Sequence, residues 1–415
     1  MKINKKEVAG IGATVVFMVL MGIITVLLGN SLADGKGKGK MTAGVMTPSR
    51  QTKEEINVWY YDESLVTYLE KAAQEYEKSN GIKVNCIKVP EENYLEKINE
   101  YNISGNDVPG IYIMNSTMLE KAVLAGLSME NKSDSIYNDE NYSKTAIQAI
   151  TYKGRKQAYP LNFDTSVMIY NQAYTQAAPA TFDDIIAFSN SMDDTMSGMV
   201  ENVLAWDIRD IMYNYGFAGA YLEYGGKNGD DPTAKSFTGE NLIQAMNYYH
   251  NLNQIFSIDI NNSSYDDIIT RFSQGKIVYT IAGTDIIKKL DEQQTHVSYG
   301  LCMMPDMNGE LKTKTLAVTN VAVVNPYAAD TRLADDFADY ISYKMAEEMY
   351  ELTGKPSGRK DIAYDDNQIN VMVDQYEKSV NLPKLMEAGD FGAKLESVLN
   401  GIWTGGDIAA LLGTL

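Results

Sequence analysis

Strand-like and helical patterns alternate along this chain from residue 56 onward, and this alternation constrains the fold more than any other feature. The runs 56–60, 82–87 and 110–114 are rich in branched and aromatic residues, as strands are. Between the first two runs, apolar residues recur at helical spacing, and Gly81 is a natural helix stop. A strand, a helix and a second strand in succession predict an α/β fold with a mostly parallel sheet covered on both faces.

The alternation continues through the rest of the 415 residues, a length that favours two globular units or one bilobal unit over a single core. A capping-box pattern at 117–120 and a capped start at Thr181 each predict a helix. The other expected elements are strands at 167–170, 277–281 and 301–304, a tyrosine-rich helical stretch at 206–224, a helix near 240–256 and a mainly helical C-terminal part.

The ends of the expected strands are the places to look for a binding site. In open α/β sheets, ligands bind where the carboxyl ends of strands turn into the following helices. This rule selects the turns at 60–64, 115–117 and 283–285.

Composition excludes several classes of function. Asp and Glu total 55 against 36 Lys and Arg, giving a net charge of −19, whereas nucleic-acid binding needs clustered cations. Two His and two Cys provide no zinc constellation. No nucleophile elbow and no phosphate-binding loop occurs in the sequence. We therefore expect no catalytic residue, no metal site and no cofactor.

The N-terminal segment predicts export. An uncharged apolar run at 8–32 follows Lys2, Lys5 and Lys6, and it is long enough to cross a bilayer as a helix. Its length favours a retained anchor, whereas the small residues around Ala33 favour cleavage of a signal peptide at 1–33. Residues 34–55 have the composition of a flexible tether. The first cysteine is Cys86, so no cysteine near the apolar run could carry a lipid.

The remaining chemistry is that of binding. A sugar site needs flat aromatic rings beside carboxylates and amides, and the run 59–63, Trp-Tyr-Tyr-Asp-Glu, supplies both kinds. Packing under the following helix is an equally good explanation for each of its aromatics. The tyrosines within 213–224 could line a cleft or fill a core, and Asp285 is more often a helix cap than a ligand.

Motifs in a fixed order along the chain resemble those of the extracellular solute-binding proteins of ABC importers, in the sugar-binding family that includes maltose-binding protein. The matching stretches are Ile-Asn-Val-Trp at 56–59, Tyr-Glu-Lys-Ser-Asn-Gly-Ile-Lys-Val at 76–84, Tyr-Pro-Leu at 159–161, Ile-Tyr-Asn at 169–171, Pro179 with Thr-Phe-Asp-Asp-Ile at 181–185, Phe-Ser-Gln-Gly-Lys at 272–276, Thr-Ile-Ala-Gly at 280–283 and Tyr-Gly at 299–300 with Met-Pro at 304–305.

The resemblance implies a two-lobed, periplasmic-binding-protein-like fold with a hinge and a ligand cleft between the lobes, preceded by the N-terminal apolar helix. The implied N-lobe is 56–162 plus 299–340, and the implied C-lobe is 163–298 plus 341–415. The implied ligand-binding residues are Tyr60, Tyr61, Asp62, Glu63, Asn115, Ser116, Asp164, Tyr213, Tyr215, Asp285, Asp390 and Phe391.

The chain also departs from the family pattern. The aromatic residue common after the Ile-x-Gly motif is replaced by Thr284 and Asp285, and Asp390 lies where a late tryptophan is usual. The resemblance therefore implies a carbohydrate ligand without specifying maltodextrin.

The implied function is non-enzymatic capture of an oligosaccharide and its delivery to ABC permease subunits by hinge closure. The expected location is the extracellular face of the membrane, tethered through 8–32, or outside the cell if the chain is cleaved after Ala33. An alternative is a surface-anchored sensor or scaffold of the same fold with a degenerate or non-sugar site. No nucleic-acid partner is expected.

Overall fold

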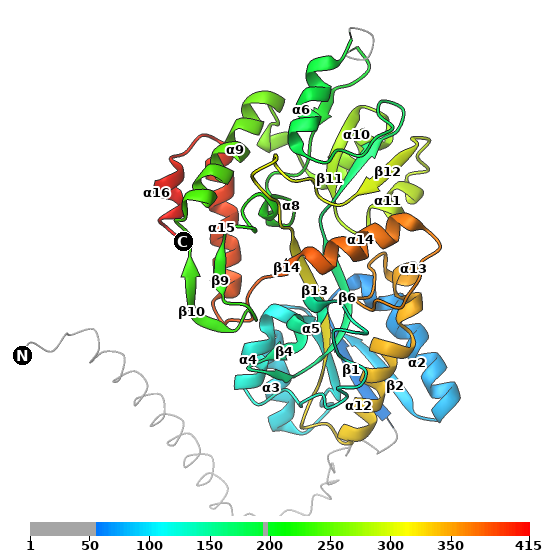
Figure 1. Ribbon diagram of the computed structural model, residues 1–415. Helices are drawn as coiled ribbons and strands as arrows, with labels where there is room; N and C mark the ends of the chain where they lie inside the picture. Colours follow the sequence, from blue (N-terminus) through cyan, green and yellow to red (C-terminus); the bar gives the residue numbers. More distant parts are fainter. Residues whose placement is uncertain (1–54, 194–197) are drawn as a thin grey trace, which may run out of the picture. The chain divides into compact units, whose positions relative to one another are not determined.

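The computed structural model describes residues 55–193 and 198–415, which fold around two β-sheets (Figure 1). The predicted anchor or signal segment and the predicted tether up to residue 54 lie outside the described residues, and Glu55, counted with the tether, is the first residue of a strand. Within the described ranges, no helix has both the length and the apolar character needed to cross a bilayer.

A six-stranded sheet contains the first predicted strands. Its order is β14–β13–β3–β1–β2, and β6 also pairs with β13. The strands are β1 (Glu55–Tyr60), β2 (Lys83–Lys88), β3 (Ile111–Asn115), β6 (Tyr159–Thr165), β13 (Leu316–Val324) and β14 (Val380–Asn381). β1 runs parallel to β2 and β3, as predicted, whereas β13 runs antiparallel to β3 and β6. The prediction of a mostly parallel sheet holds for three of the five strand pairs, β1–β2, β1–β3 and β13–β14. The two pairs of β13 with β3 and β6 are antiparallel, because β13 enters the sheet from the opposite direction.

Helices pack on this sheet around one apolar core. α2 ends at Gly81, whose φ of 71° lies in the left-handed region that glycine adopts without strain, so the predicted stop is confirmed. The helices of this part are α2 (Val66–Asn80), α3 (Tyr94–Ser104), α4 (Leu119–Leu124), α5 (Lys144–Ile150), α12 (Thr331–Asp339) and α13 (Met349–Thr353), and β4 (Thr151–Tyr152) pairs with β5 (Arg155–Lys156) beside α5.

A four-stranded sheet, ordered β12–β7–β11–β8, organises a second part with its own cores. Its strands are β7 (Val167–Asn171), β8 (Asn202–Leu204), β11 (Ile277–Ala282) and β12 (Tyr299–Cys302), with α6 (Phe182–Ser191), α8 (Ile211–Asn214), α9 (Glu240–Phe256), α10 (Tyr265–Ser273), α11 (Ile286–Glu292), α15 (Ala388–Trp403), α16 (Ile408–Leu412) and the hairpin β9 (Glu223–Gly225) to β10 (Asp231–Ser236). Strand β7 is antiparallel to both β11 and β12, so this sheet too is mixed.

Two expected helix features differ from the structure. The predicted capping box at 117–120 is wrong, because the Asn115 side chain accepts the Thr117 N–H at 3.0 Å and opens a short 3-10 turn instead. The stretch 206–224 is not one helix: α8 is a single turn, and Gly219 lies so close to the Lys314 carbonyl that an added Cβ would be 2.2 Å from its oxygen. By contrast, the capped helix start predicted at Thr181 is confirmed, and the structure shows that Thr181 and Asp184 form a capping box there.

The chain passes between the two parts three times: directly from β6 to β7, from β12 to β13, and, after α14 (Asn367–Lys378), from β14 to α15. One buried side-chain hydroxyl from each passage meets the other two. The Oγ1 atoms of Thr165 and Thr315 are 3.0 Å apart, and Ser379 Oγ lies 2.9 Å from the first and 2.6 Å from the second. We call Thr165, Thr315 and Ser379 the hydroxyl triangle, and it joins all three passages at one place.

The predicted lobe bounds stay a prediction, but the sheets do not follow them residue by residue. β12, placed by the sequence with β13, pairs with β7 in the four-stranded sheet. Met349 of α13, assigned to the other lobe, is buried in the core of the six-stranded part.

Candidate functional site

The turn after β1 presents Asp62 to two segments far away in the sequence. Its Oδ2 accepts a hydrogen bond from Asn320 Nδ2 at 3.0 Å and forms an ion pair with Lys355 Nζ at 3.1 Å. Its Oδ1 caps the next turn through the Ser64 N–H and hydroxyl. Burial raises the pKa of this carboxyl, but the Lys355 ammonium and the Ser64 bonds outweigh burial and hold the pKa below its usual value.

Lys355 is the cation of a cluster with three carboxylates. Burial lowers the pKa of its ammonium, but the charges of Asp164, Asp62 and Asp285 more than compensate, so the pKa lies above its usual value. Burial and the neighbouring Asp164 charge raise the pKa of Asp285. We call Asp62, Asp164, Asp285 and Lys355 the polar cluster.

The first passage between the sheets and the turn after β11 meet in this cluster. Asp164 Oδ1 accepts both the backbone N–H and the hydroxyl of Thr284, at 3.0 and 2.8 Å. Gly283 fits tightly between the two carboxylates, because an added Cβ would lie 3.1 Å from Asp285 and 3.3 Å from Asp164. The predicted turns at 60–64 and 283–285 thus contribute to one cluster.

Two stacked tyrosines flank the cluster. The rings of Tyr213 and Tyr265 are 5.0 Å apart with an interplanar angle of 18°. The Tyr265 hydroxyl donates to Asp285 at 2.9 Å and accepts the Gly283 N–H at 3.1 Å. Burial is the largest cause that raises the pKa of each tyrosine, so both hydroxyls stay protonated.

Asn115, Ser116 and Tyr61 form a second group at the end of β3. The Tyr61 hydroxyl accepts the Asn115 N–H at 2.8 Å, and its ring contacts Tyr94 edge-on at 5.1 Å. Ser116 is buried, and its hydroxyl has no hydrogen-bond partner among the described residues. A buried hydroxyl without a partner costs free energy unless a water or a ligand satisfies it.

Four of the remaining predicted residues form no hydrogen bond or ion pair with these groups among the described residues. Tyr60 and Tyr215 are core residues with 5% and 6% of their surfaces exposed. Glu63 is exposed and pairs with Lys88, and Asp390 is exposed on α15. The sequence rule for strand ends finds the turns, but it cannot separate a ring that packs inward from one that faces a ligand.

Phe391 belongs to what we call the aromatic patch, Tyr224, Phe237 and Phe391. The Phe391 ring lies 4.4 Å from Tyr224 and 5.3 Å from Phe237, and it is buried. The three rings border a cavity of about 330 Å³ together with Lys235, Glu387, Asp390, Lys394 and Leu415. No hydrogen bond or ion pair between the described residues connects this patch with the polar cluster.

Sequence reasoning missed Lys355 and Tyr265. Lys355 follows Gly354, a residue with a φ of 73° that ends α13, and no periodic pattern marks that segment. A signal did exist for Tyr265, because Ser264 is the N-cap of α10 and places the tyrosine at the first helical position, where its hydroxyl reaches Gly283 and Asp285.

Comparisons with known proteins agree with this architecture. The family described as "Bacterial extracellular solute-binding protein" matches residues 71–381. The maltooligosaccharide ABC transporter solute-binding lipoproteins of Streptococcus pneumoniae strains R6 and TIGR4 are each 22% identical to the chain over 362 residues, 84% of this chain and 84% of each relative.

Solved structures confirm the predicted fold class. A cyclo/maltodextrin-binding protein complexed with maltotetraose has a TM-score of 0.75 at 19% identity, covering 91% of this chain and 96% of its own. An extracellular solute-binding protein from Staphylococcus aureus in complex with maltose has a TM-score of 0.76 at 18% identity, covering 87% and 95%. These likenesses establish the two-lobed α/β fold.

Proposed function

Because the chain belongs to the bacterial extracellular solute-binding proteins, which bind a solute and are not enzymes, we propose that it captures an oligosaccharide and delivers it to an ABC permease. The single observation that carries this proposal is the polar cluster, where carboxylates from both sheets and from the passage between them converge. The names of the Streptococcus pneumoniae relatives support a maltooligosaccharide as the first ligand to test.

The chemistry of the cluster suits a polyol. Carboxylates accept hydrogen bonds from sugar hydroxyls, an ammonium donates to them, and the partly exposed ring of Tyr265 offers flat apolar surface. Lys355 already neutralises part of the negative charge, so a neutral ligand enters without bringing a counter-ion.

The mechanism of hinge closure rests on the fact that the side chains around the polar cluster belong to two different parts of the fold. Asp62 belongs to the six-stranded sheet, whereas Asp285 and Tyr265 belong to the four-stranded part. A ligand makes the most contacts when the two parts are close enough for residues of both to reach it. Binding therefore shifts the population of the protein toward this closed arrangement. The permease would recognise the loaded form.

We expect the protein to act at the outer face of the cell membrane. The family is extracellular, and the Streptococcus pneumoniae relatives are lipoproteins. In this chain the run 8–32 takes the role of the tether, and cleavage after Ala33 would release the protein instead.

Thermal unfolding with and without maltotetraose tests the proposal. Binding to the native state raises the melting temperature by an amount that grows with the logarithm of 1 plus the ratio of ligand concentration to Kd. Asp164→Asn keeps an acceptor for Thr284 but removes the charge, and it should abolish the shift while the unliganded melting temperature changes little.

A matched variant outside the cluster, Asp390→Asn, controls for loss of an exposed carboxylate. New reducing ends during incubation would identify a hydrolase. No shift with any of a panel of neutral oligosaccharides would favour the sensor or scaffold with a non-sugar site.

A further inference from the structure

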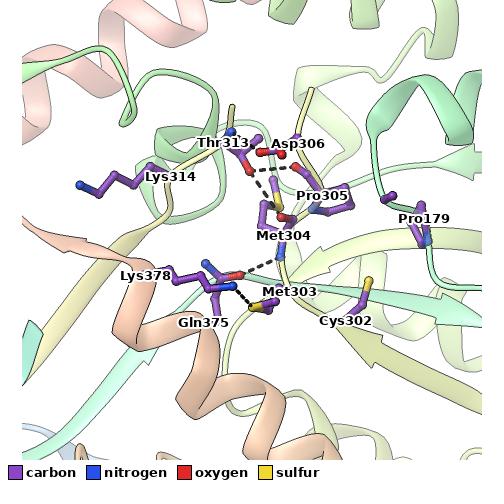
Figure 2. A pocket seen from close by; sticks show the side chains of 11 residues that line it. Pro179, Cys302, Met303, Met304, Pro305, Asp306, Thr313, Lys314, Gln375 and Lys378 are labelled. Atoms are coloured by element: carbon purple, nitrogen blue, oxygen red, sulfur yellow. Dashed lines mark hydrogen bonds between the residues drawn. The ribbon is translucent and has the colours of Figure 1, made fainter. Parts of the chain in front are cut away.

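A cavity of about 410 Å³ lies apart from the residues of the polar cluster, where the second passage between the sheets meets α14 (Figure 2). Three stretches of chain line it: residues 179–180 ahead of α6, the passage at 302–306 and 313–314, and Gln375 with Lys378 on α14. Its size falls within the roughly 300–1,000 Å³ of small-molecule sites.

The position of one wall is fixed by a buried side chain. Gln375 Oε1 accepts the Met304 N–H at 2.7 Å, and its Nε2 donates to Thr315 Oγ1 at 2.8 Å. Only 5% of Gln375 is exposed. Both ends of this amide are therefore satisfied without a ligand, and the cavity is preformed around them.

The lining is apolar and rich in sulfur on one side. Cys302, Met303, Met304, Pro179 and Pro305 all border the space. Methionine is flexible and polarisable, so it adapts to irregular apolar ligands. This surface suits a small aliphatic or aromatic body.

The charges of the lining are unbalanced. Asp306 is already engaged, because its Oδ2 pairs with Lys312 at 2.8 Å and its Oδ1 accepts the Thr313 N–H at 3.1 Å. By contrast, no carboxylate of the described residues lies within ion-pair distance of Lys314 or Lys378. The hydrogen bond recorded for Lys378 Nζ goes to the Met303 thioether at 3.4 Å, a weak acceptor.

Lys314 and Lys378 are both exposed residues at the rim of this cavity, and they lie there in a chain with a net charge of −19. Figure 2 shows Lys314 and Lys378 on the same side of the cavity, across from Pro179. In this view the Lys378 ammonium points toward Met303 and the Lys314 ammonium points away from it, so a carboxylate at Lys378 would gain a charge-assisted hydrogen bond while its apolar body lies against the methionines.

We propose that this cavity is a second binding site, separate from the carbohydrate cleft, for a small organic anion with an apolar body, such as a carboxylate. The proposal does not depend on which solute the polar cluster binds.

The test is a titration of the full chain, reconstituted in lipid nanodiscs and labelled with ¹³C at the methionine methyl groups. The probes are hexanoate and, as its neutral counterpart of the same shape, hexanamide. The variants Met303→Leu and Met304→Leu assign the two methyl resonances among those of the 21 methionines.

We expect hexanoate to shift both resonances and to bind at least about tenfold more tightly than hexanamide, since the amide lacks the charge. The double variant K314Q/K378Q should lose about tenfold in hexanoate affinity. The double variant K78Q/K132Q, which removes two exposed lysines elsewhere, should keep it.

The proposal is overturned if neither methyl resonance moves, if the two probes bind equally, or if K314Q/K378Q binds hexanoate as the unmodified chain does. Each of these results can be read whether or not maltotetraose binds, so failure here is distinguishable from failure of the proposed function.

Discussion

The polar cluster and the aromatic patch both contain residues that the sequence selects for ligand binding, yet they are built in opposite ways. The cluster gathers side chains from distant segments, and hydrogen bonds or ion pairs hold each of its carboxylates. In the patch, the rings of Tyr224, Phe237 and Phe391 pack on one another, so much of their apolar surface is already used. The difference indicates that convergence of charge, more than the presence of aromatic rings, distinguishes the candidate site.

The patch gives the largest expected change in stability. Phe391→Ala removes a buried ring from two aromatic neighbours, and we expect a loss of about 3–4 kcal/mol in the free energy of unfolding. Urea denaturation measures this loss. If the ring only supports the fold, the Kd for maltotetraose stays within about twofold, whereas a large rise in Kd would return Phe391 to the site.

The cluster should respond in both stability and binding. Lys355→Met leaves Asp62, Asp164 and Asp285 without their shared cation, and we expect to lose about 2–3 kcal/mol of unfolding free energy, less than for a fully buried pair because the lysine is 22% exposed. Maltotetraose binding should fall with it.

Lys360→Met is the matched control, since this nearby lysine forms a more exposed pair with Glu377 at 3.6 Å. Its expected cost is below about 1 kcal/mol. Equal costs for the two variants would contradict the special role given to Lys355.

A smaller effect is expected at the second group of predicted residues. Tyr61→Phe removes the hydroxyl that accepts the Asn115 N–H but leaves the ring in contact with Tyr94. We expect a loss of about 1 kcal/mol in unfolding free energy and a rise of a few fold in the Kd for maltotetraose. An unchanged Kd would separate this group from the cluster.

The smallest effect concerns a buried lysine outside both regions. Lys384 Nζ donates to the backbone carbonyls of Gln148, at the end of α5, and Asn228, in the β9–β10 turn. Burial lowers the pKa of this ammonium to about 8, with the nearby Asp230 charge opposing the shift. Above that pH the unfolded chain binds more protons at this group than the native state does, so its contribution to stability rises with pH.

The quantity to measure is the free energy of unfolding of the unmodified chain minus that of Lys384→Met. We expect this difference to increase by about 0.7 kcal/mol when the pH is raised from 7.5 to 8.5. Chemical denaturation at the two pH values measures it. The cysteines and tyrosines titrate in both proteins, so their effect on stability cancels when the two free energies of unfolding are subtracted. A shift of opposite sign would contradict the lowered pKa.

The sequence predicts the parts of the candidate site that follow local rules, but it does not predict contacts between segments that are distant in the chain. Asp62 and Asp285 follow strands, and the strand-end rule predicts that such turns meet a ligand. Lys355 cannot be found in this way, because its partners are as much as 293 positions away and nothing local selects it. The expected helix at 206–224 fails for a related reason: Gly219 is required by the approach of Lys314, a contact that helical spacing does not contain.

The hydroxyl triangle has a mechanical consequence. Two bodies tied at three separated points resist both sliding and turning, whereas ties that meet at one point act as a ball joint. Thr165, Thr315 and Ser379 bring the three passages to such a point. The Thr165 hydroxyl also donates to the Leu316 carbonyl and the Ser379 hydroxyl to the Gln375 carbonyl, so each of these two protons has a second acceptor within reach. We therefore expect the two parts to move relative to each other mainly by rotation about this point.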